Sequence, residues 1–307
     1  MGKHKLAFVA FDSAKAKHAV AIAADGRDGE VRFKPANDVA AKTAQRARGP
    51  ALRSEAMPAT LYGAAGANNQ RLCEPQRRVR ILLNEISPEP DAKAVVDAGA
   101  DELHVHPRDD AGRESLHPRD MAAALQAIRT RVPGLLVGVS TGWWILPDGR
   151  ARRNHIHAWR VLPDYVSVNL IEEEAPEIIA LVLAKGIGVE AGLWSRRDAE
   201  RFAALADAPR CLRVLIEINE QDLSDGLAVA HDIMAILDRA DLRAPRLLHG
   251  YEATKWPLYR EALRLELDTR IGFEDGALLP SRATARSNAD LIRAARALRE
   301  QPTEVNP

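Results

Sequence analysis

Two histidines at the end of a short apolar run have the spacing of metal ligands. The run Leu103-His104-Val105-His106 has the composition of a buried β-strand, in which side chains two residues apart point to the same side. Both imidazoles would then be directed at one point, as a metal site requires. A pair of hydrogen-bonded core histidines is the alternative interpretation, and the H-x-H pattern alone does not exclude it.

A second predicted strand end, in the stretch TRIGFED, carries two carboxylates. Glu274 and Asp275 end this stretch, and Arg270 lies four residues before Glu274, on the same side of the pleat. If the two strand ends face one pocket, His104, His106 and Glu274 form a two-histidine, one-carboxylate site with open coordination positions. These ligand types suit Zn²⁺ or another divalent transition metal.

The other polar residues at strand ends would act on a substrate. A metal ion in this site would polarise a carbonyl group and stabilise an enolate, and Asp275 is the candidate general base. Arg270 would hold a substrate carboxylate or orient Asp275, and a salt bridge inside the fold is the alternative role. Hydrogen bonds to substrate oxygens are expected from Ser140, Thr141 and Asn169.

From residue 79 the sequence alternates short apolar runs with amphipathic segments. Strands are predicted over 79–84, 102–106, 135–141, 164–170, 188–193, 212–218, 246–249 and 269–273. Helices are predicted over 90–98, 118–131, 151–161, 176–185, 196–206, 224–239, 254–265 and 287–299. Eight β–α units in about 220 residues predict a (β/α)₈ barrel, which places active-site residues at the carboxyl ends of its strands. A doubly wound open sheet is disfavoured because no glycine-rich phosphate-binding motif follows the first strand.

The first 78 residues have a different composition. Their opening reads as two β-runs around a turn, and the remainder lacks sustained periodicity, which favours loop or disorder. Residues 1–32 weakly resemble the first hairpin of RNase H-like transposases, in which Asp12 would be the first metal-binding carboxylate. We expect an N-terminal extension over 1–78 and a catalytic barrel over 79–307, and favour a fused fragment without its own activity over an accessory hairpin.

Composition limits the class of protein. The 43 Lys and Arg residues balance 43 Asp and Glu residues, which argues against nucleic acid or a membrane surface as the main partner. Two cysteines far apart in the chain, Cys73 and Cys211, predict no disulfide framework and favour a cytoplasmic location. No apolar run reaches the roughly 18 residues of a membrane span.

Residues 79–299 resemble the β-keto acid cleavage enzymes, the family that includes 3-keto-5-aminohexanoate cleavage enzyme. The matching stretches, in chain order, are LHVHPRDDAGRES, VGVSTG, DYVSVNL, GVEAGLW, TRIGFED and SNADLIRAARAL. The resemblance implies one Zn²⁺ bound by His104, His106 and Glu274. It further implies that Asp275 is the general base and that Arg270 supports it.

The same resemblance implies a substrate pocket and a reaction. Glu190 would join the catalytic residues, and the residues implied to contact or surround the substrate are Ser140, Thr141, Ser167, Asn169 and Glu85. The implied reaction is a reversible Claisen-type exchange, in which a β-keto acid and acetyl-CoA give acetoacetate and a new acyl-CoA. The family also implies a homo-oligomer.

Three departures from the family pattern leave other functions open. The segment Asn84–Pro88 leads almost directly into a shortened first helix, the strand over 212–218 is followed by no glycine-rich loop, and the C-terminal tail is short. Because the glycine-rich loop is missing, the sequence does not identify a CoA pocket. One alternative is therefore a CoA-independent, metal-dependent aldolase or lyase, and the other is a catalytically silent barrel damaged by N-terminal fusion or deletion.

Overall fold

The computed structural model describes residues 81–84 and 90–300, with residues 81–84 and 90–91 described by their backbone alone. The chain divides into two units, 1–59 and 60–307, and every described residue belongs to the second. The predictions for residues 1–78, Asp12 and Glu85 lie outside the described residues. The boundary predicted at residue 79 stays a prediction.

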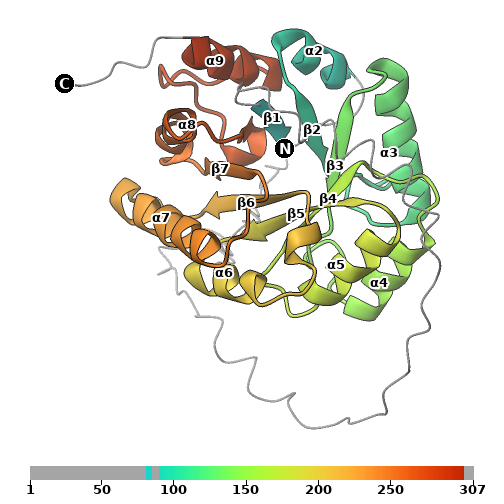
Figure 1. Cartoon of the computed structure of the whole chain (residues 1–307). Coiled ribbons are helices and arrows are strands. Elements are labelled where there is room, and N and C mark those ends of the chain that lie inside the picture. The colour runs from blue at the N-terminus through green and yellow to red at the C-terminus, as the bar shows by residue number, and fades with distance from the viewer. Residues whose placement is uncertain (1–80, 85–89, 301–307) are drawn as a thin grey trace, which may run out of the picture. The chain divides into compact units, whose positions relative to one another are not determined.

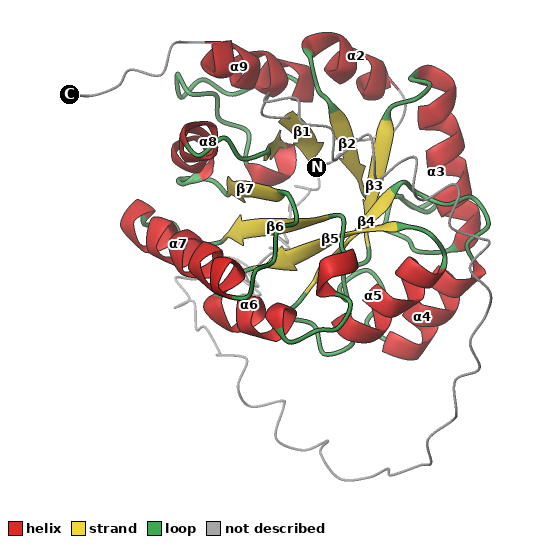
Figure 2. Ribbon diagram, viewed as in Figure 1, coloured by secondary structure: helices red, strands yellow, loops and turns green. Residues whose placement is uncertain are grey.

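The described residues alternate strands and helices throughout (Figures 1 and 2). The strands are β1 (Ile81–Asn84), β2 (Glu102–Val105), β3 (Leu136–Ser140), β4 (Tyr165–Asn169), β5 (Gly188–Leu193), β6 (Arg213–Ile218), β7 (Arg246–Gly250) and β8 (Thr269–Gly272). The helices are α2 (Pro90–Ala98), α3 (Pro118–Arg131), α4 (Gly149–Ala158), α5 (Ala175–Ala184), α6 (Arg196–Ala203), α7 (Leu223–Arg239), α8 (Lys255–Arg264) and α9 (Asn288–Glu300). Two 3-10 turns, η3 (Ala208–Arg210) and η4 (Phe273–Asp275), complete the order. The predicted strands and helices are all present, with ends that differ by a few residues.

The eight strands form one parallel sheet that closes on itself. Their order is β7-β6-β5-β4-β3-β2-β1-β8, and β1 pairs with both β2 and β8. The sheet closes between β7 and β8 through a parallel bridge between Leu247 and Asp268, where the Leu248 amide donates to the Asp268 carbonyl at 2.9 Å. The predicted (β/α)₈ barrel is confirmed, and the open doubly wound sheet is excluded. Figure 1 shows the helices surrounding the strands.

Polar side chains fix the first turns of several helices. Asp148, Ser195 and Asp222 precede α4, α6 and α7, and each accepts a hydrogen bond from a backbone amide of the first turn. Such N-caps satisfy amides that have no partner inside the helix. Asp198 completes the arrangement at α6 by accepting from the Trp194 amide at 3.1 Å. These caps therefore define the residue at which each of the three helices begins.

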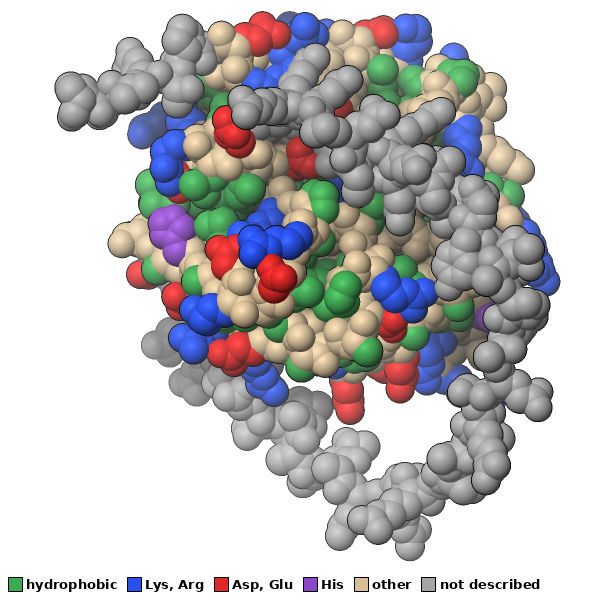
Figure 3. Space-filling model, viewed as in Figure 1, with side chains coloured by type: hydrophobic (Ala, Val, Ile, Leu, Met, Phe, Trp, Pro, Cys, Tyr) green, Lys and Arg blue, Asp and Glu red, His purple; other side chains and the backbone are tan. Residues whose placement is uncertain are grey.

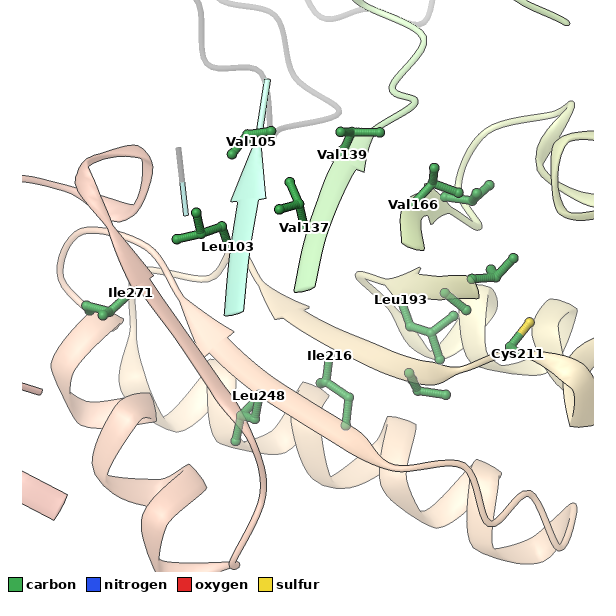
Figure 4. Close-up of a cluster of buried hydrophobic side chains, with 14 of the residues drawn as sticks. Leu103, Val105, Val137, Val139, Val166, Leu193, Cys211, Ile216, Leu248 and Ile271 are labelled. Carbon is green, nitrogen blue, oxygen red and sulfur yellow. The ribbon is translucent and has the colours of Figure 1, made fainter. Parts of the chain in front are cut away.

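The two-residue alternation of each strand separates two kinds of side chain. One set is apolar, faces the helices and is fully buried, as Ile216, Leu248 and Ile271 are. Figure 4 shows these side chains along neighbouring strands, on the side that packs against the helices. The other set faces the barrel interior, where apolar side chains form a small separate cluster of Tyr165, Leu212, Leu215 and Leu247. Buried charged residues, among them Glu102, Glu190, Arg213 and Arg270, share the interior with this cluster.

Gly138 makes room for the largest of these interior side chains. A Cβ atom at residue 138 would lie 2.1 Å from the ring of Tyr165, and Tyr165 is fully buried. The Tyr165 hydroxyl donates to the Leu103 carbonyl at 3.2 Å. The glycine on β3 thus allows β4 to fill the lower part of the barrel.

Lys and Arg side chains are interspersed with Asp and Glu side chains on the face seen in Figure 3. This pattern agrees with the net charge of zero for the whole chain. No helix among the described residues has the length and apolar character that crossing a membrane requires.

Replacing Leu248 with alanine tests the packing of the strands against the helices. Leu248 is fully buried, whereas Leu278 in the loop after β8 is 48% exposed. Leu248→Ala should lower the free energy of unfolding by about 2–5 kcal/mol because it removes buried methyl groups and leaves a cavity. Leu278→Ala is the matched control, with an expected change within about 0.5 kcal/mol. Urea denaturation measures both, and equal effects would contradict this packing.

Candidate active site

The site lies at the carboxyl ends of the strands, as a barrel requires. Its side chains face the interior from β2, β3, β4, β5, β6, β7 and β8, and nearly all are buried. They form three groups: a histidine–carboxylate cluster, a second cluster around His249, and a layer of buried charges beneath both.

The predicted metal ligands come together at the ends of β2 and β8. His104 and His106 are both buried, and their ring centroids lie 5.3 Å apart. His106 Nε2 lies 3.6 Å from Glu274 Oε2. Two strand ends that are far apart in the sequence therefore place these three side chains in one cluster.

His106 has a second acidic neighbour that was not expected from the sequence. Its Nδ1 atom lies 3.1 Å from Oε2 of Glu114, in the loop between β2 and α3. The same oxygen accepts a hydrogen bond from Trp144 Nε1 at 2.8 Å. Burial by itself would raise the pKa of Glu114, but His106 and Trp144 outweigh it and lower this pKa below its usual value.

Burial controls the protonation of the cluster. It lowers the pKa of His104 well below its usual value, and the nearby Arg270 charge acts in the same direction. His104 is therefore neutral at physiological pH. Burial also raises the pKa of Glu274 to about 7, with a further contribution from Asp275 that His106 and Arg270 oppose.

The donor atoms of this cluster fit a divalent cation. His104 Nδ1 and Glu274 Oε2 are buried and have no hydrogen-bond partner among the described residues, and such atoms are costly unless they bind something. Two imidazoles and a carboxylate are ligands that Zn²⁺ accepts. Within 81–84 and 90–300, however, no three His, Cys, Asp or Glu side chains are close enough together to form a complete ligand set.

The turn that carries Glu274 and Asp275 is held from two sides. The Glu252 amide donates to the Asp275 carbonyl at 2.8 Å, and Lys255 Nζ donates to the Gly276 carbonyl. From α9, Asn288 Oδ1 accepts from the Phe273 amide at 3.0 Å. These contacts explain why β8 ends at Gly272 and continues as the 3-10 turn η4.

The second cluster places the predicted general base against a histidine. Asp275 is fully buried, and its Oδ1 atom lies 3.2 Å from His249 Nδ1. On the other side of the ring, His249 Nε2 lies 3.8 Å from Glu217 Oε2. Burial alone would lower the pKa of His249, but the nearby carboxylates of Asp275 and Glu217 raise it to about 9. His249 is therefore a cation at neutral pH.

Beneath the two clusters, four buried charges alternate in sign across the barrel. Arg213 donates from Nε to Glu190 Oε2 at 2.5 Å, and its Nη1 lies 2.9 Å from Glu102 Oε2. Arg270 donates to the other oxygen of Glu190. Burial would raise the pKa of Glu190, but Arg270 and Arg213 hold it below its usual value. Glu190 is thus an anion shared by two cations, and Arg270 makes the salt bridge considered from the sequence.

The predicted substrate-binding residues of β3 and β4 are buried at neighbouring strand ends. The strand register pairs Ser140 with Ser167, and Ser167 in turn with Glu190. Thr141 Oγ1 donates to the Ser167 carbonyl at 2.7 Å, so its donor is already used. The fourth predicted residue, Asn169, donates to Glu172 Oε1 at 3.5 Å.

Glu172 connects Asn169 to the helix layer. Its Oε2 atom accepts from the fully buried Arg152 of α4 at 2.7 Å. Burial raises the pKa of Glu172 to about 7, although Arg152 opposes the shift. The predicted substrate ligand Asn169 is therefore oriented by a buried ion pair.

Six residues of the site carry no predicted role, namely Glu102, Glu114, Glu172, Arg213, Glu217 and His249. The positions of Glu217 and His249 near strand ends are a usable signal, because polar residues there face the pocket of a barrel. Glu114 and Glu172 lie in loops, and no pattern of spacing relates them to His106 or Asn169.

Several large apolar side chains are exposed in the segments that follow strands. The large hydrophobic residues that are exposed in the described part of the chain are Trp143, Ile171, Leu223, Phe273 and Leu278. All five follow the carboxyl ends of strands.

Comparison with known proteins identifies one matching family and several solved structures with a similar fold. The family model described as beta-keto acid cleavage enzyme matches residues 87–304. No curated protein sequence matches the chain. The family match includes the ends of both β2 and β8.

Solved structures with the same fold include two enzymes. One is a ternary complex of ObcA with C4-CoA adduct and oxalate, at 16% identity and a TM-score of 0.55, covering 67% of this chain. This chain covers only 61% of the ObcA chain. The other is tryptophan synthase subunit alpha from Legionella pneumophila str. Paris, at 13% identity and a TM-score of 0.51, covering 76% of this chain and 97% of that one. At these identities the likeness concerns the fold alone.

Replacing Glu190 tests the layer of buried charges. Glu190→Gln removes the anion shared by Arg213 and Arg270, and should lower the free energy of unfolding by about 3–5 kcal/mol because it leaves an uncompensated buried charge. Glu200→Gln, at an exposed pair with Arg196, should change it little. Urea denaturation measures both variants. A Glu190→Gln protein as stable as the parent would show that the layer does not need this anion.

Proposed function

The chain belongs to the beta-keto acid cleavage enzyme family, and on this basis we propose that it transfers the acyl group of a β-keto acid to CoA. The substrate R–CO–CH₂–COO⁻ and acetyl-CoA would give acetoacetate and R–CO–CoA. The observation that carries the proposal is the meeting of the β2 and β8 ends, where His106 Nε2 lies 3.6 Å from Glu274 Oε2. Asp275, the next residue, supplies a buried carboxylate for proton transfer.

The histidine–carboxylate cluster would hold a divalent metal ion, with Zn²⁺ as the first candidate. Its ligands would be His104, His106 and Glu274, and a bound ion would act as a Lewis acid on the substrate carbonyl. The buried atoms without hydrogen-bond partners support this assignment. So does the raised pKa of Glu274, because a buried carboxylate is stabilised by a nearby cation.

Asp275 would take the proton that leaves carbon during the acyl exchange. Its carboxylate is oriented by His249 at 3.2 Å, while the Glu252 amide fixes its backbone. A general base must be held within hydrogen-bond reach of its proton, and this double support keeps the carboxylate at the end of β8. His249 would stay charged and act as a positioning residue.

The keto acid would lie between this cluster and the ends of β3 and β4. Ser140, Ser167 and Asn169 would donate hydrogen bonds to its oxygens, and Thr141 would fix the local backbone through its bond to the Ser167 carbonyl. Arg270 and Glu190 would act from beneath, as a charged support for the site. A role for Glu85 stays a prediction from the family, as do the homo-oligomer and the cytoplasmic location.

Acetyl-CoA is proposed as the second substrate. The family supports this choice, and the ObcA complex contains a C4-CoA adduct. The exposed apolar residues that follow the strand ends suit the chain of an acyl group, because burial of apolar surface favours binding. The alternative is a lyase that uses the same site without CoA.

An activity assay distinguishes these reactions. The full-length protein, supplied with Zn²⁺, is incubated with a panel of β-keto acids in the presence and absence of acetyl-CoA. Acetoacetate and a new acyl-CoA should appear only when acetyl-CoA is present. Loss of keto acid without acetyl-CoA would support the lyase, and no reaction under either condition would support a silent barrel.

Replacing Asp275 should nearly abolish this activity. Asp275→Asn keeps the size of the side chain but removes the base, and should lower kcat by about a hundredfold or more. Asp241→Asn is the control, because Asp241 is exposed and pairs only with Arg243 in a loop. If Asp275→Asn retained the parent kcat, another residue would have to be the base.

Zinc affinity should depend on pH through Glu274. Its pKa is raised to about 7, and the metal binds only the deprotonated carboxylate, so protons compete with zinc below that pH. The affinity should fall by about tenfold for each pH unit below about 7 and level off above it. Competition with a chromophoric chelator measures this profile. Glu274→Gln should bind more weakly and with a shallower pH profile, because only the histidine ligands still compete for protons, and a parent profile that is flat across the range would contradict the assignment.

A further inference from the structure

The two nitrogen atoms of His106 face two different carboxylates. Nδ1 lies 3.1 Å from Glu114 Oε2, and Nε2 lies 3.6 Å from Glu274 Oε2. A neutral imidazole has one N–H donor and one lone-pair acceptor. The carboxylate that receives the hydrogen bond therefore decides which nitrogen is left to bind a metal.

We propose that Glu114 is a positioning residue that holds the proton of His106 on Nδ1, so that the lone pair of Nε2 faces Glu274. This inference rests on the proposed function, because it specifies how one of the metal ligands is prepared. Histidine ligands of metals commonly donate their other N–H to a carboxylate, which fixes the tautomer and the orientation of the ring.

The contact distances support Glu114 as the acceptor. Its Oε2 atom is 0.5 Å closer to His106 than Glu274 Oε2 is, as the distances of 3.1 Å and 3.6 Å show. Two lone pairs that face each other, on Nε2 and on Glu274, repel unless a cation lies between them. The arrangement thus favours a metal ion at Nε2 and a proton at Nδ1.

Glu114 is held in place by contacts on both sides. Its Oε2 atom accepts from Trp144 Nε1 at 2.8 Å, and its backbone forms an antiparallel bridge with Arg108. Gly142 leaves the space for this tryptophan, because a Cβ atom there would lie 2.2 Å from the Trp144 ring. Loops after two different strands therefore fix the acceptor of the His106 proton.

Backbone bonds tie this loop to the end of β2. The Ser115 amide donates to the Pro107 carbonyl at 2.7 Å, and the Asp109 amide donates to the Arg113 carbonyl at 2.8 Å. The Glu114 side chain is only 22% exposed, whereas that of Asp110 in the same loop is 88% exposed and pairs with Arg119. Glu114 thus differs from an ordinary surface acid, and Asp110 provides a matched control.

The first test measures the tautomer directly. Nitrogen NMR of the imidazole of His106 is recorded in the metal-free protein from about pH 7 to about pH 11, and the tautomer is read on the high-pH plateau, where the ring carries one proton. The parent and Asp110→Ala should carry the proton on Nδ1, and Glu114→Ala should shift it toward Nε2. Glu114→Gln should restore the Nδ1 form, because the amide oxygen still accepts a hydrogen bond. The same tautomer in the parent and in Glu114→Ala would overturn the proposal.

The second test measures zinc affinity by competition with a chromophoric chelator. Glu114→Ala should bind Zn²⁺ about 10–100-fold more weakly than the parent, as is typical for the loss of such a partner. Glu114→Gln should lie between them, and Trp144→Phe should show a smaller loss than Glu114→Ala, because it removes the donor that orients Glu114 and shortens the ring stacked on His106 but keeps the carboxylate. Circular dichroism confirms that each variant is folded.

The two proposals fail in different ways. If the parent bound no zinc, the metal-dependent function would be wrong, and the tautomer measurement would still decide the role of Glu114. If the parent bound zinc tightly and Glu114→Ala bound it equally well, the positioning role alone would be wrong.

Discussion

Glu190 accepts hydrogen bonds from Arg213 and Arg270, and the polar interior of the barrel depends on this shared anion. Charges buried in a protein are tolerated when they are paired and hydrogen-bonded. Glu102 adds a second carboxylate to Arg213, so two anions and two cations alternate across the strands. This balance allows charged groups to occupy a level of the barrel that branched aliphatic residues usually fill.

The charged layer also sets the position of β8. Arg270 is anchored to Glu190 on β5, while β8 pairs with β1 on one side and closes onto β7 on the other. The next turn, η4, therefore begins from a fixed point, and contacts from the β7–α8 loop and from α9 direct Glu274 and Asp275 to different partners. Glu274 faces His106, and Asp275 faces His249. The alternation of side chains along each strand thus directs apolar groups, which stabilise the fold, toward the helices and reactive groups toward the barrel interior.

Most of the fold was predictable because parallel strands buried on both faces leave short apolar runs in the sequence. The convergence of His104, His106 and Glu274 followed from two simple rules, the alternation of side chains in a strand and the placement of active sites at strand ends. The 3-10 form of η4 was not predictable, since it depends on a hydrogen bond donated by the Glu252 amide and on one accepted by the Asn288 side chain, and both residues are distant in sequence.

The polar partners of the site were harder to foresee. His249 lies at a strand end, but its charge arises from Asp275 in η4 and Glu217 on β6. Glu114 contacts His106 from one loop, and Glu172 contacts Asn169 from another. The conformation of a loop leaves no periodic pattern in the sequence. The role of Glu85 falls outside the described residues and stays a prediction.

The central claim is that the ends of β2 and β8 form one metal site. Its most direct test is X-ray diffraction from crystals of the full-length protein purified with zinc, with data recorded on both sides of the zinc absorption edge. The account predicts one anomalous peak per chain at about 2.0–2.2 Å from a nitrogen of His104, a nitrogen of His106 and a carboxylate oxygen of Glu274. Zinc bound elsewhere, or no peak between these three residues, would contradict it.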